Sequence, residues 1–280
     1  MRIKKKKLSL IYRLKRDIYF SLIRFIRFFQ SIFLKKQNNK FLFILSPPYC
    51  GSTLLNQLLS TSKNVSCNNT LGTREGQLLP GVRHFMFQKN RWNEHVKYPW
   101  DKVKKVWLKY WDLSKPVLLD KSIPNIMRVS EIKKEFENIN FICMVRNPYA
   151  QIEGVMRRND ESAKNAAIFS LKCLQYQRQN IKNEESLLFI SYEQLTENPE
   201  KTKRKIIAFL PELSDIKMDL KYKAHNFKTK SKMGIVNLNQ EKVDKLTGEQ
   251  IETINRTFEK EKELLDYFGY QIVKRIETYE

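Results

Sequence analysis

The sequence is poor in the residues that build repetitive, cross-linked or metal-stabilised proteins. Its 280 residues include 8 Gly, 9 Pro, 4 Cys and 3 His. This composition, without an internal repeat, excludes a low-complexity or fibrous chain. The cysteines form no C-x-x-C pair and the histidines complete no zinc spacing, so we expect neither structural zinc nor a disulfide framework. Unpatterned cysteines fit a reducing compartment.

Acidic residues are also scarce. The chain has 30 Asp and Glu against 52 Lys and Arg, a net charge of +22, and 41% hydrophobic residues. It can therefore bury a core, and its charge predicts contact with a nucleotide, a nucleic acid, a membrane surface or an acidic substrate. Residues 1–40 hold thirteen basic residues and a single acidic one, Asp17. More than half of the surplus charge therefore lies in the first seventh of the chain.

Long hydrophobic runs are missing from the same N-terminal region. Its longest uncharged stretches, 18–23 and 28–34, are shorter than the roughly 18–20 apolar residues of a membrane span. Arg24 and Arg27 also interrupt the hydrophobic region that a secretory signal needs. At helical periodicity, basic residues gather on one side and large apolar residues on the other. This pattern predicts a helix over residues 8–34 that lies on an anionic membrane, in a basic arm over 1–39. The alternative is a helix packed on the domain with its arginines in solvent.

The remainder, residues 40–280, predicts one α/β domain. Continuous apolar runs at 41–45, 116–119, 140–145 and 187–190 are typical of strands buried on both faces. Helical patterns follow at 54–59, 126–136, 149–183 and 200–210. This alternation predicts a three-layer domain with a central, mostly parallel sheet flanked by helices. Ligands of such sheets bind at the carboxyl ends of the strands.

The loop after the first predicted strand carries the first candidate site. Gly51 lets the backbone approach a ligand closely, and Ser52 and Thr53 begin a helix whose N-terminus favours an anion. The loop is not the triphosphate-binding G-x-x-x-x-G-K-[ST], because it has neither the upstream glycine nor a lysine before Ser52. On the structural interpretation, the two hydroxyl residues cap the helix.

Two further strand ends carry chemistry. Arg146 follows the third predicted strand, at the same edge as the first loop, and Arg158 lies twelve residues later in a helix. Arginine grips phosphate through two parallel hydrogen bonds. Tyr192 ends the last predicted strand, where its phenol can stack or hydrogen-bond.

Three ordered motifs now carry a family resemblance. P-x-x-G-S-T-L-L at 48–55, M-V-R-N-P-Y-A at 144–150 and Y-E-Q-L-x-x-N-P at 192–199 resemble the sulfotransferases that use 3′-phosphoadenylyl sulfate (PAPS). The likeness is to their bacterial, carbohydrate and protein-tyrosine branches and covers residues 40–275. It implies a P-loop-like fold, a PAPS donor and no metal.

The resemblance also implies roles for individual residues. The 5′-phosphosulfate would be held by the loop residues Cys50, Gly51, Ser52, Thr53 and Leu54. The 3′-phosphate would be bound by Arg146, with Arg158 and Tyr192 completing the nucleotide site. Glu75 would act as the base, while Lys121 and Ser52 would stabilise charge on the leaving phosphate. The acceptor would bear a hydroxyl, on a carbohydrate or lipid-linked glycan in preference to a protein or small alcohol.

The chain departs from the family pattern at two positions. Tyr49 stands where the family usually has Lys or Arg, and Gly154 stands where it usually has Ser. These departures put the catalytic rate and part of the nucleotide affinity in question, so a catalytically weak nucleotide-binding homologue at the membrane surface remains an alternative. A P-loop-type kinase is another, with Asp120 as its metal-holding carboxylate, although the loop lysine is missing.

A third alternative is a non-enzymatic basic protein that binds membranes or nucleic acid. No RNA-binding motif is present, so we expect no nucleic-acid partner. The aromatic and basic stretch 83–111 is interpreted as an acceptor cleft or a helical lid, and neither His84 nor His95 is given a role. We expect a cytoplasmic protein, peripheral on the inner membrane face.

Overall fold

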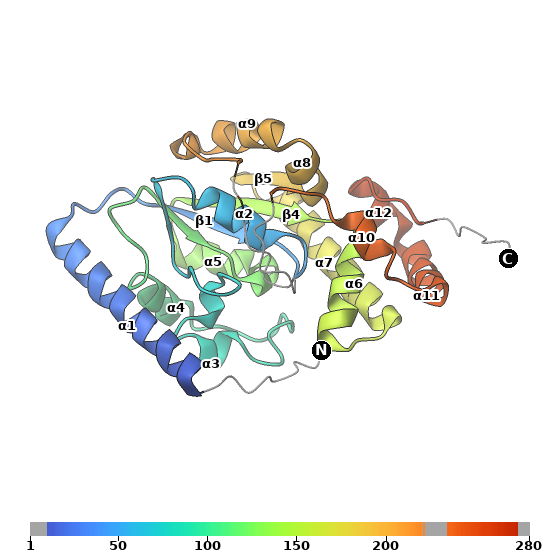
Figure 1. Cartoon of the computed structure of the whole chain (residues 1–280), viewed down its shortest axis with the longest axis horizontal. Coiled ribbons are helices and arrows are strands. Elements are labelled where there is room, and N and C mark those ends of the chain that lie inside the picture. Colours follow the sequence, from blue (N-terminus) through green and yellow to red (C-terminus); the bar gives the residue numbers. More distant parts are fainter. Residues whose placement is uncertain (1–9, 220, 222–233, 274–280) are drawn as a thin grey trace.

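The fold is a five-stranded parallel sheet between layers of helices (Figure 1), seen in a computed structural model. The structure describes residues 10–219, 221 and 234–273. The strand order is β2-β3-β1-β4-β5. The strands are β1 (Lys40–Leu45), β2 (Val65–Cys67), β3 (Val117–Asp120), β4 (Ile139–Val145) and β5 (Leu187–Ser191). The predicted fold class is confirmed. Only β2, three residues long and without an apolar run, has no counterpart among the predicted strands.

The central strand β1 shows why the continuous apolar runs form this sheet. β1 pairs in parallel with β3 on one side and with β4 on the other. Phe43 and Leu45 point to one face, where they pack with the tryptophans of α4 (Trp100–Trp107) and with Phe136, which follows α5 (Val129–Glu135). Leu42 and Ile44 point to the opposite face, under α2 (Ser52–Leu59), α8 (Tyr192–Glu197) and α9 (Pro199–Phe209). A strand covered on both sides needs apolar residues at every position.

The aromatic stretch 83–111 belongs largely to this core. Trp100, Trp107 and Trp111 are buried against the sheet and against one another. The short helix α3 (Arg83–Met86) precedes them. These tryptophans therefore form neither a cleft nor a lid, and His84 and His95 are exposed.

The helices after β4 build a second core beside the sheet. The helical stretch predicted over 149–183 forms two helices, α6 (Pro148–Asn159) and α7 (Ala163–Asn183). They pack with α11 (Gly248–Phe258) and α12 (Lys262–Tyr267), and α10 (Asn239–Val243) lies against α6.

One side chain of α7 reaches the carboxyl ends of both central strands. The buried Gln177 donates from Nε2 to the carbonyl oxygens of Leu45 (2.7 Å) and Met144 (3.0 Å), the last residue of β1 and the penultimate residue of β4. Backbone carbonyls at strand ends need such partners when they are buried.

The first helix, α1 (Leu10–Phe33), runs along the outside of the domain, apart from the sheet layers (Figure 1). It falls inside the span where the sequence predicts a helix. None of the helices in the described part of the chain combines the length and hydrophobicity that a membrane crossing demands.

Candidate functional site

A cavity of about 620 Å³ opens at the carboxyl edge of the sheet. The loops after β1, β3, β4 and β5 each contribute a predicted residue to its lining: Ser52, Lys121, Arg146 and Tyr192. Gly51, Thr53, Leu54 and Glu75 also line it. Parallel strands bring their carboxyl ends to one edge, so residues far apart in sequence converge here.

Gly51 shapes the loop between β1 and α2. Its φ of +88° lies in the left-handed region that favours glycine, and an added Cβ would sit 2.5 Å from Cδ2 of Tyr192. Gly51 is also the N-cap of α2 and has no side chain to cap the first-turn N–H groups. These groups and the hydroxyls of Ser52 and Thr53 are suited to an anionic ligand, and we refer to them as the anion cradle.

Cys50 contributes differently from its neighbours in this loop. Its side chain is fully buried and lies outside the cavity lining, and burial raises the pKa of the thiol. A neutral, inaccessible thiol performs no chemistry on a ligand. The Cys50 side chain therefore does not contribute to the cradle.

Lys121, Glu75 and Thr53 meet within the cavity wall. The buried Lys121 ammonium lies 3.4 Å from Oε1 of Glu75 and donates to Oγ1 of Thr53 at 3.2 Å. Gln77 donates a short hydrogen bond to the other Glu75 oxygen. The buried carboxylate is therefore paired with a cation and held in place by an amide, in contact with the anion cradle.

Asp120 fixes the backbone next to Glu75 through hydrogen bonds. It accepts hydrogen bonds from the Gly76 backbone N–H (3.1 Å), Asn68 (2.9 Å) and Asn125 (3.0 Å), and burial raises its pKa to about 6. Gly76 must be glycine, since a Cβ would lie 2.1 Å from Oδ1 of Asp120. Asp120 does not line the cavity, so it positions the Glu75 loop and is not placed to hold a nucleotide-bound metal.

Arg146 is buried directly after β4, and one nitrogen of its guanidinium makes no hydrogen bond with the described residues. It donates from Nη1 to the Tyr49 carbonyl (3.0 Å) and from Nε to Asn239 (2.7 Å), and its guanidinium lies 4.1 Å above the ring centre of Tyr192. Among the described residues, Nη2 has no hydrogen-bond partner. An orphaned donor on a buried guanidinium that lines a cavity is suited to an anionic ligand.

Tyr192 connects this site to the C-terminal segment. Its hydroxyl donates to the carbonyl of Val236 (2.9 Å) and accepts from the N–H of Leu238 (3.2 Å). Its ring lies between Gly51 and Arg146. The predicted stacking position is thus occupied on one side by the guanidinium.

Arg158 lies on the exposed side of α6, outside the cavity lining. Its positive charge lowers the pKa of Tyr49, against the larger opposite effect of burial, so it is near the cavity rim. The preceding residue, Arg157, does line the cavity, where its Nε lies 2.5 Å from Oε1 of Glu153. Arg157 therefore belongs to the cavity lining, whereas Arg158 acts on Tyr49 from outside that lining.

Sequence reasoning missed Arg91, which lies between α3 and α4. It is 5% exposed, lines the cavity and sits 4.6 Å above the ring centre of Phe87. Its Nε has no partner among the described residues, and burial lowers its pKa, while the charges of Glu75 and Tyr49 act in the opposite direction. No motif surrounds Arg91, and only its position in the predicted 83–111 cleft pointed toward the site.

The C-terminal wall was also missed. Lys242 of α10 and Lys245 just after it line the cavity, and both pair with Glu241, at 3.2 and 2.5 Å. The stretch has no local motif, and it reaches the site through α10, which packs on α6. Among the described residues, no three His, Cys, Asp or Glu side chains come close enough to form a metal site.

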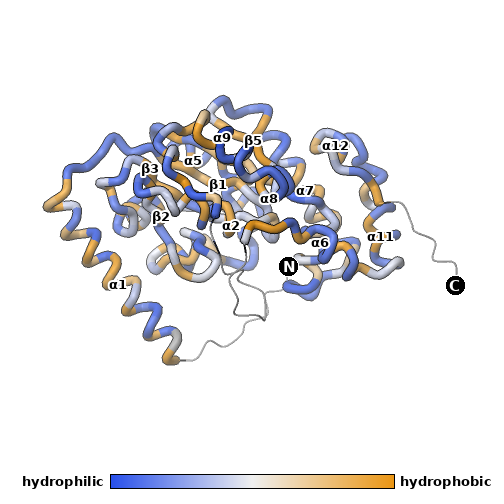
Figure 2. Tube along the Cα trace, turned by 45° about the horizontal axis from the view of Figure 1, so that its top comes forward, coloured by the Kyte–Doolittle hydropathy of each residue, from blue (hydrophilic) through white to orange (hydrophobic). Residues whose placement is uncertain are grey.

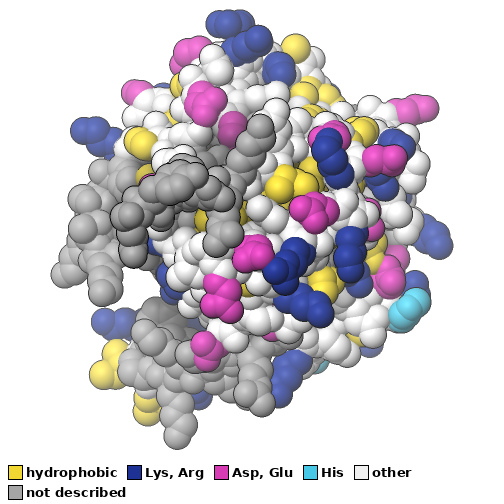
Figure 3. Space-filling view, turned by 90° about the vertical axis from the view of Figure 1, so that its right-hand side faces the viewer, with side chains coloured by type: hydrophobic (Ala, Val, Ile, Leu, Met, Phe, Trp, Pro, Cys, Tyr) yellow, Lys and Arg dark blue, Asp and Glu magenta, His cyan; other side chains and the backbone are white. Residues whose placement is uncertain are grey.

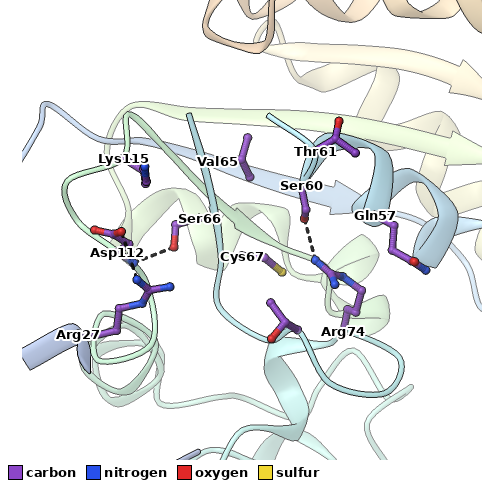
Figure 4. Close-up of a pocket in the computed structure, with 11 residues that line it drawn as sticks. Arg27, Gln57, Ser60, Thr61, Val65, Ser66, Cys67, Arg74, Asp112 and Lys115 are labelled. Atoms are coloured by element: carbon purple, nitrogen blue, oxygen red, sulfur yellow. Dashed lines mark hydrogen bonds and ion pairs between the residues drawn. The ribbon is translucent and has the colours of Figure 1, made fainter. Parts of the chain in front are cut away.

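A second cavity, of about 450 Å³, lies between α1 and the β2 edge of the sheet (Figure 4). None of the predicted site residues lines it. Its two arginines are engaged by protein groups: Arg27 pairs with Asp112 at 3.2 Å, and Arg74 donates to Ser60 at 2.8 Å. The chemistry of the molecule therefore concentrates in the first cavity.

Comparison with known proteins defines the class. The model of a sulfotransferase family matches residues 42–214, and the chain belongs to this family. The match contains the anion cradle, Glu75, Lys121, Arg146 and Tyr192. No curated sequence gives a significant match.

Solved structures show the same fold. The sulfotransferase domain of the Synechococcus PCC 7002 olefin synthase is 21% identical, with a TM-score of 0.52, and the match covers 85% of this chain and 98% of that one. A sulfotransferase from Alicyclobacillus acidocaldarius is 11% identical, with a TM-score of 0.50 and the same coverages. One from Mycobacterium avium is 13% identical, with a TM-score of 0.50, covering 85% of this chain and 79% of that one.

Proposed function

We propose that the protein transfers the sulfuryl group of PAPS to a hydroxyl acceptor. Membership of the sulfotransferase family sets the reaction class. The observation that carries the proposal is the convergence of the α2 N-terminus, the orphaned Arg146 guanidinium and the Glu75–Lys121 pair in one cavity. The cavity thus combines two kinds of anion-binding group with a carboxylate.

The residues present fit a nucleotide with two separate anionic groups. The cradle of Gly51, Ser52 and Thr53 would hold the phosphosulfate, and the free Nη2 of Arg146 would bind the 3′-phosphate. The ring of Tyr192 packs against the Arg146 guanidinium. The Tyr192 hydroxyl accepts a hydrogen bond from the Leu238 N–H. Arg158, near the rim, would add long-range attraction at most, because exposed charges are screened.

The proposed chemistry follows from this placement. The Glu75 carboxylate, held 3.4 Å from the Lys121 ammonium, would accept the acceptor's hydroxyl proton, and the acceptor oxygen would form the new bond to sulfur. The bond from sulfur to the bridging phosphate oxygen breaks, and its electron pair stays on that oxygen. Lys121, Ser52 and the first-turn N–H groups would stabilise the growing negative charge.

Arg91 is a candidate to replace the cation that the family usually has at position 49. The family's loop cation is missing from position 49, but the buried guanidinium of Arg91, from another segment, lines the same cavity as Tyr49 and Glu75. We propose that Arg91 supplies the missing positive charge, which favours an active enzyme over a weak homologue.

For the acceptor we propose a glycan or lipid-linked glycan. The support is the mixed lining of the cavity, in which apolar side chains (Leu78, Phe87, Ile123) stand beside the Glu153–Arg157 ion pair. Sugars present apolar C–H faces as well as hydroxyls, and binding sites of this kind combine both contacts. The four buried, free thiols fit a reducing compartment, and we propose a cytoplasmic location.

Calorimetric titration with 3′-phosphoadenosine 5′-phosphate (PAP), the product nucleotide, tests this function. We expect PAP to bind the wild type and to bind Arg146→Ala at least tenfold more weakly. The matched control is Arg204→Ala, at an exposed position of α9, and this variant should bind PAP as the wild type does. A folded wild type that neither binds PAP nor consumes PAPS with any acceptor would refute the proposal. Strict dependence on ATP and Mg²⁺ would favour a kinase instead.

A further inference from the structure

Helix α1 is attached to the domain by one face only. Phe20, 4% exposed, packs edge-on against Tyr110, and the Tyr19 hydroxyl bonds to Thr70. Arg27 forms the ion pair with Asp112 that Figure 4 shows, and it also donates to the Tyr110 carbonyl. The face that docks is therefore the one with Arg27, not the apolar stripe that a conventional amphipathic helix would bury.

The opposite face of α1 is apolar and exposed. Of the fifteen large apolar side chains exposed in the described part of the chain, twelve belong to residues 10–34. They recur along the whole helix (Figure 2), and at 100° per residue most fall on one broad arc. This arc consists of Leu10, Ile11, Leu14, Ile18, Leu22, Phe25, Ile26, Phe28, Phe29, Ile32 and Phe33. A continuous apolar surface of this size marks an interaction site.

Cations border the arc. Arg13 and Arg24 lie beyond one edge of it and Lys15 lies within its other edge, and all three are exposed. Arg83 of α3 adds a further charge, and the positive charges of Arg16 and Arg13 contribute to lowering its pKa after the larger effect of burial. The single acidic residue of α1, Asp17, is paired with Arg16 at 2.8 Å.

The far end of the molecule offers a contrast. On the face over α11 and α12, basic and acidic side chains are intermixed (Figure 3), and pairs such as Arg256 with Glu252 and Lys262 with Asp266 neutralise one another locally. This face therefore lacks the combination of an apolar arc and a basic border that α1 has.

We propose that α1 docks the protein on an anionic membrane surface, with its apolar arc in the headgroup and acyl boundary. A bilayer with anionic lipids supplies both an apolar phase and negative charge, so it is complementary to the arc and to its border. A second copy of the chain is less suitable, since a symmetric interface through α1 would bring Arg13, Lys15 and Arg24 toward the same cations.

Docking through α1 also sets the orientation of the domain. The helix is fixed by Phe20, Tyr19 and Arg27 and is not joined to the domain by its chain connection alone, so the domain would sit on the membrane in one pose. If the proposed transferase activity holds, a lipid-linked acceptor would then be presented to a cavity of fixed orientation. Membrane docking itself does not depend on that activity.

Vesicle co-sedimentation of the full chain tests the proposal. We expect binding to phosphatidylcholine vesicles that contain about one third phosphatidylglycerol, at least tenfold weaker binding to pure phosphatidylcholine, and weakening by salt. The variant Leu14→Ser/Ile18→Ser/Phe25→Ser/Phe29→Ser should lose at least tenfold in affinity. The variant Arg13→Gln/Lys15→Gln/Arg24→Gln should lose the preference for anionic lipid.

The controls separate docking from folding and from activity. Ile168→Ser, at an exposed apolar position outside α1, should bind vesicles as the wild type does. Every variant should keep the wild-type melting temperature, because all substituted side chains are exposed. The proposal would be overturned if the wild type did not bind anionic vesicles. It would also be overturned if the four-serine variant bound them with the wild-type affinity. A lipid-free dimer that the four-serine variant converts to a monomer, without vesicle binding, would assign the arc to a second copy.

Discussion

The ring of Tyr49 fills the space that a side chain at position 154 would need. A Cβ added to Gly154 would lie 2.7 Å from Cγ and 2.8 Å from Cβ of Tyr49. These are the two positions at which the chain departs from the family pattern, and they touch although 105 residues separate them. With Tyr49 placed as it is here, position 154 has no room for a side chain, so the two departures are coupled.

This contact predicts a strongly non-additive pair of substitutions. Gly154→Ser should lower the free energy of unfolding by about 1–3 kcal/mol, because overpacking forces the half-buried Tyr49 side chain to move. In a Tyr49→Gly background, which removes both contacted atoms, the same substitution should cost at least about 1 kcal/mol less. Urea denaturation of the four proteins measures both effects. Gly248→Ser, where a Cβ meets nothing within 4 Å, is the matched control and should change stability by less than about 0.5 kcal/mol. Additive costs would disprove the coupling.

The Glu75 carboxylate should be needed for turnover more than for donor binding. Glu75→Gln keeps the shape of the side chain but removes the proton acceptor, so we expect turnover to fall by about 10²–10⁴-fold. PAP affinity should change by less than roughly tenfold, as measured by calorimetry beside a PAPS-consumption assay. Glu184→Gln, in the remote ion pair with Lys133, should leave both unchanged. Equal losses of affinity and turnover would instead indicate a structural role for Glu75.

Arg91 should act in the reaction through its positive charge. Arg91→Gln removes the charge from the cavity, and we expect turnover to fall by about 10²-fold, with Arg91→Lys losing less. The exposed Arg83, close to Arg91 in sequence, provides the control Arg83→Gln, which should leave turnover unchanged. If Arg91→Gln and Arg91→Lys retain full turnover while folded, the loop cation has no replacement here and Tyr49 must be sufficient.

The raised pKa of Asp120 predicts that the stability of the protein depends on pH. Its pKa in the folded protein, about 6, lies above the value of about 3.9 for an unfolded chain, so the folded state binds the proton more tightly. The resulting stabilisation is present below about pH 4 and is lost as the pH rises through about 6. Compared with Asp120→Asn, the wild type should lose about 2 kcal/mol of unfolding free energy between pH 4 and 7.

Asparagine is a suitable replacement for Asp120. The Oδ1 atom of Asn125 has no partner among the described residues, so rotating the Asn125 amide lets it accept from the new side chain. Denaturation at several pH values gives the difference between the two proteins. A difference that stays constant from pH 4 to 7 would show that folding does not raise the pKa of Asp120.

The sequence predicted those parts of the fold and site that depend on local pattern. Apolar runs marked β1, β3, β4 and β5 because a doubly covered strand has no polar positions, and residues at their carboxyl ends necessarily share one edge. This is why Gly51, Lys121, Arg146 and Tyr192 were found together in the cavity.

What sequence reasoning missed depends on long-range packing. Arg91 and Lys242 come from segments without a motif, and they reach the cavity only through contacts of α3, α4 and α10 with the rest of the domain. The same holds for α1: its amphipathic pattern was legible, but which face docks depends on Asp112 and Tyr110, far along the chain. A periodicity identifies two faces and does not say which one the protein covers.

Gln177 restrains the geometry of the candidate site through two hydrogen bonds. By bonding to Leu45 and Met144 it joins the strand that leads into the anion cradle to the strand that leads into Arg146. The separation between the two anion-binding groups is then fixed before any ligand arrives. A nucleotide whose two charged groups match that spacing would bind with little loss of conformational entropy, whereas one with a different spacing would have to break a buried hydrogen bond. The selectivity of the cavity would then rest partly on a glutamine that lies outside its lining.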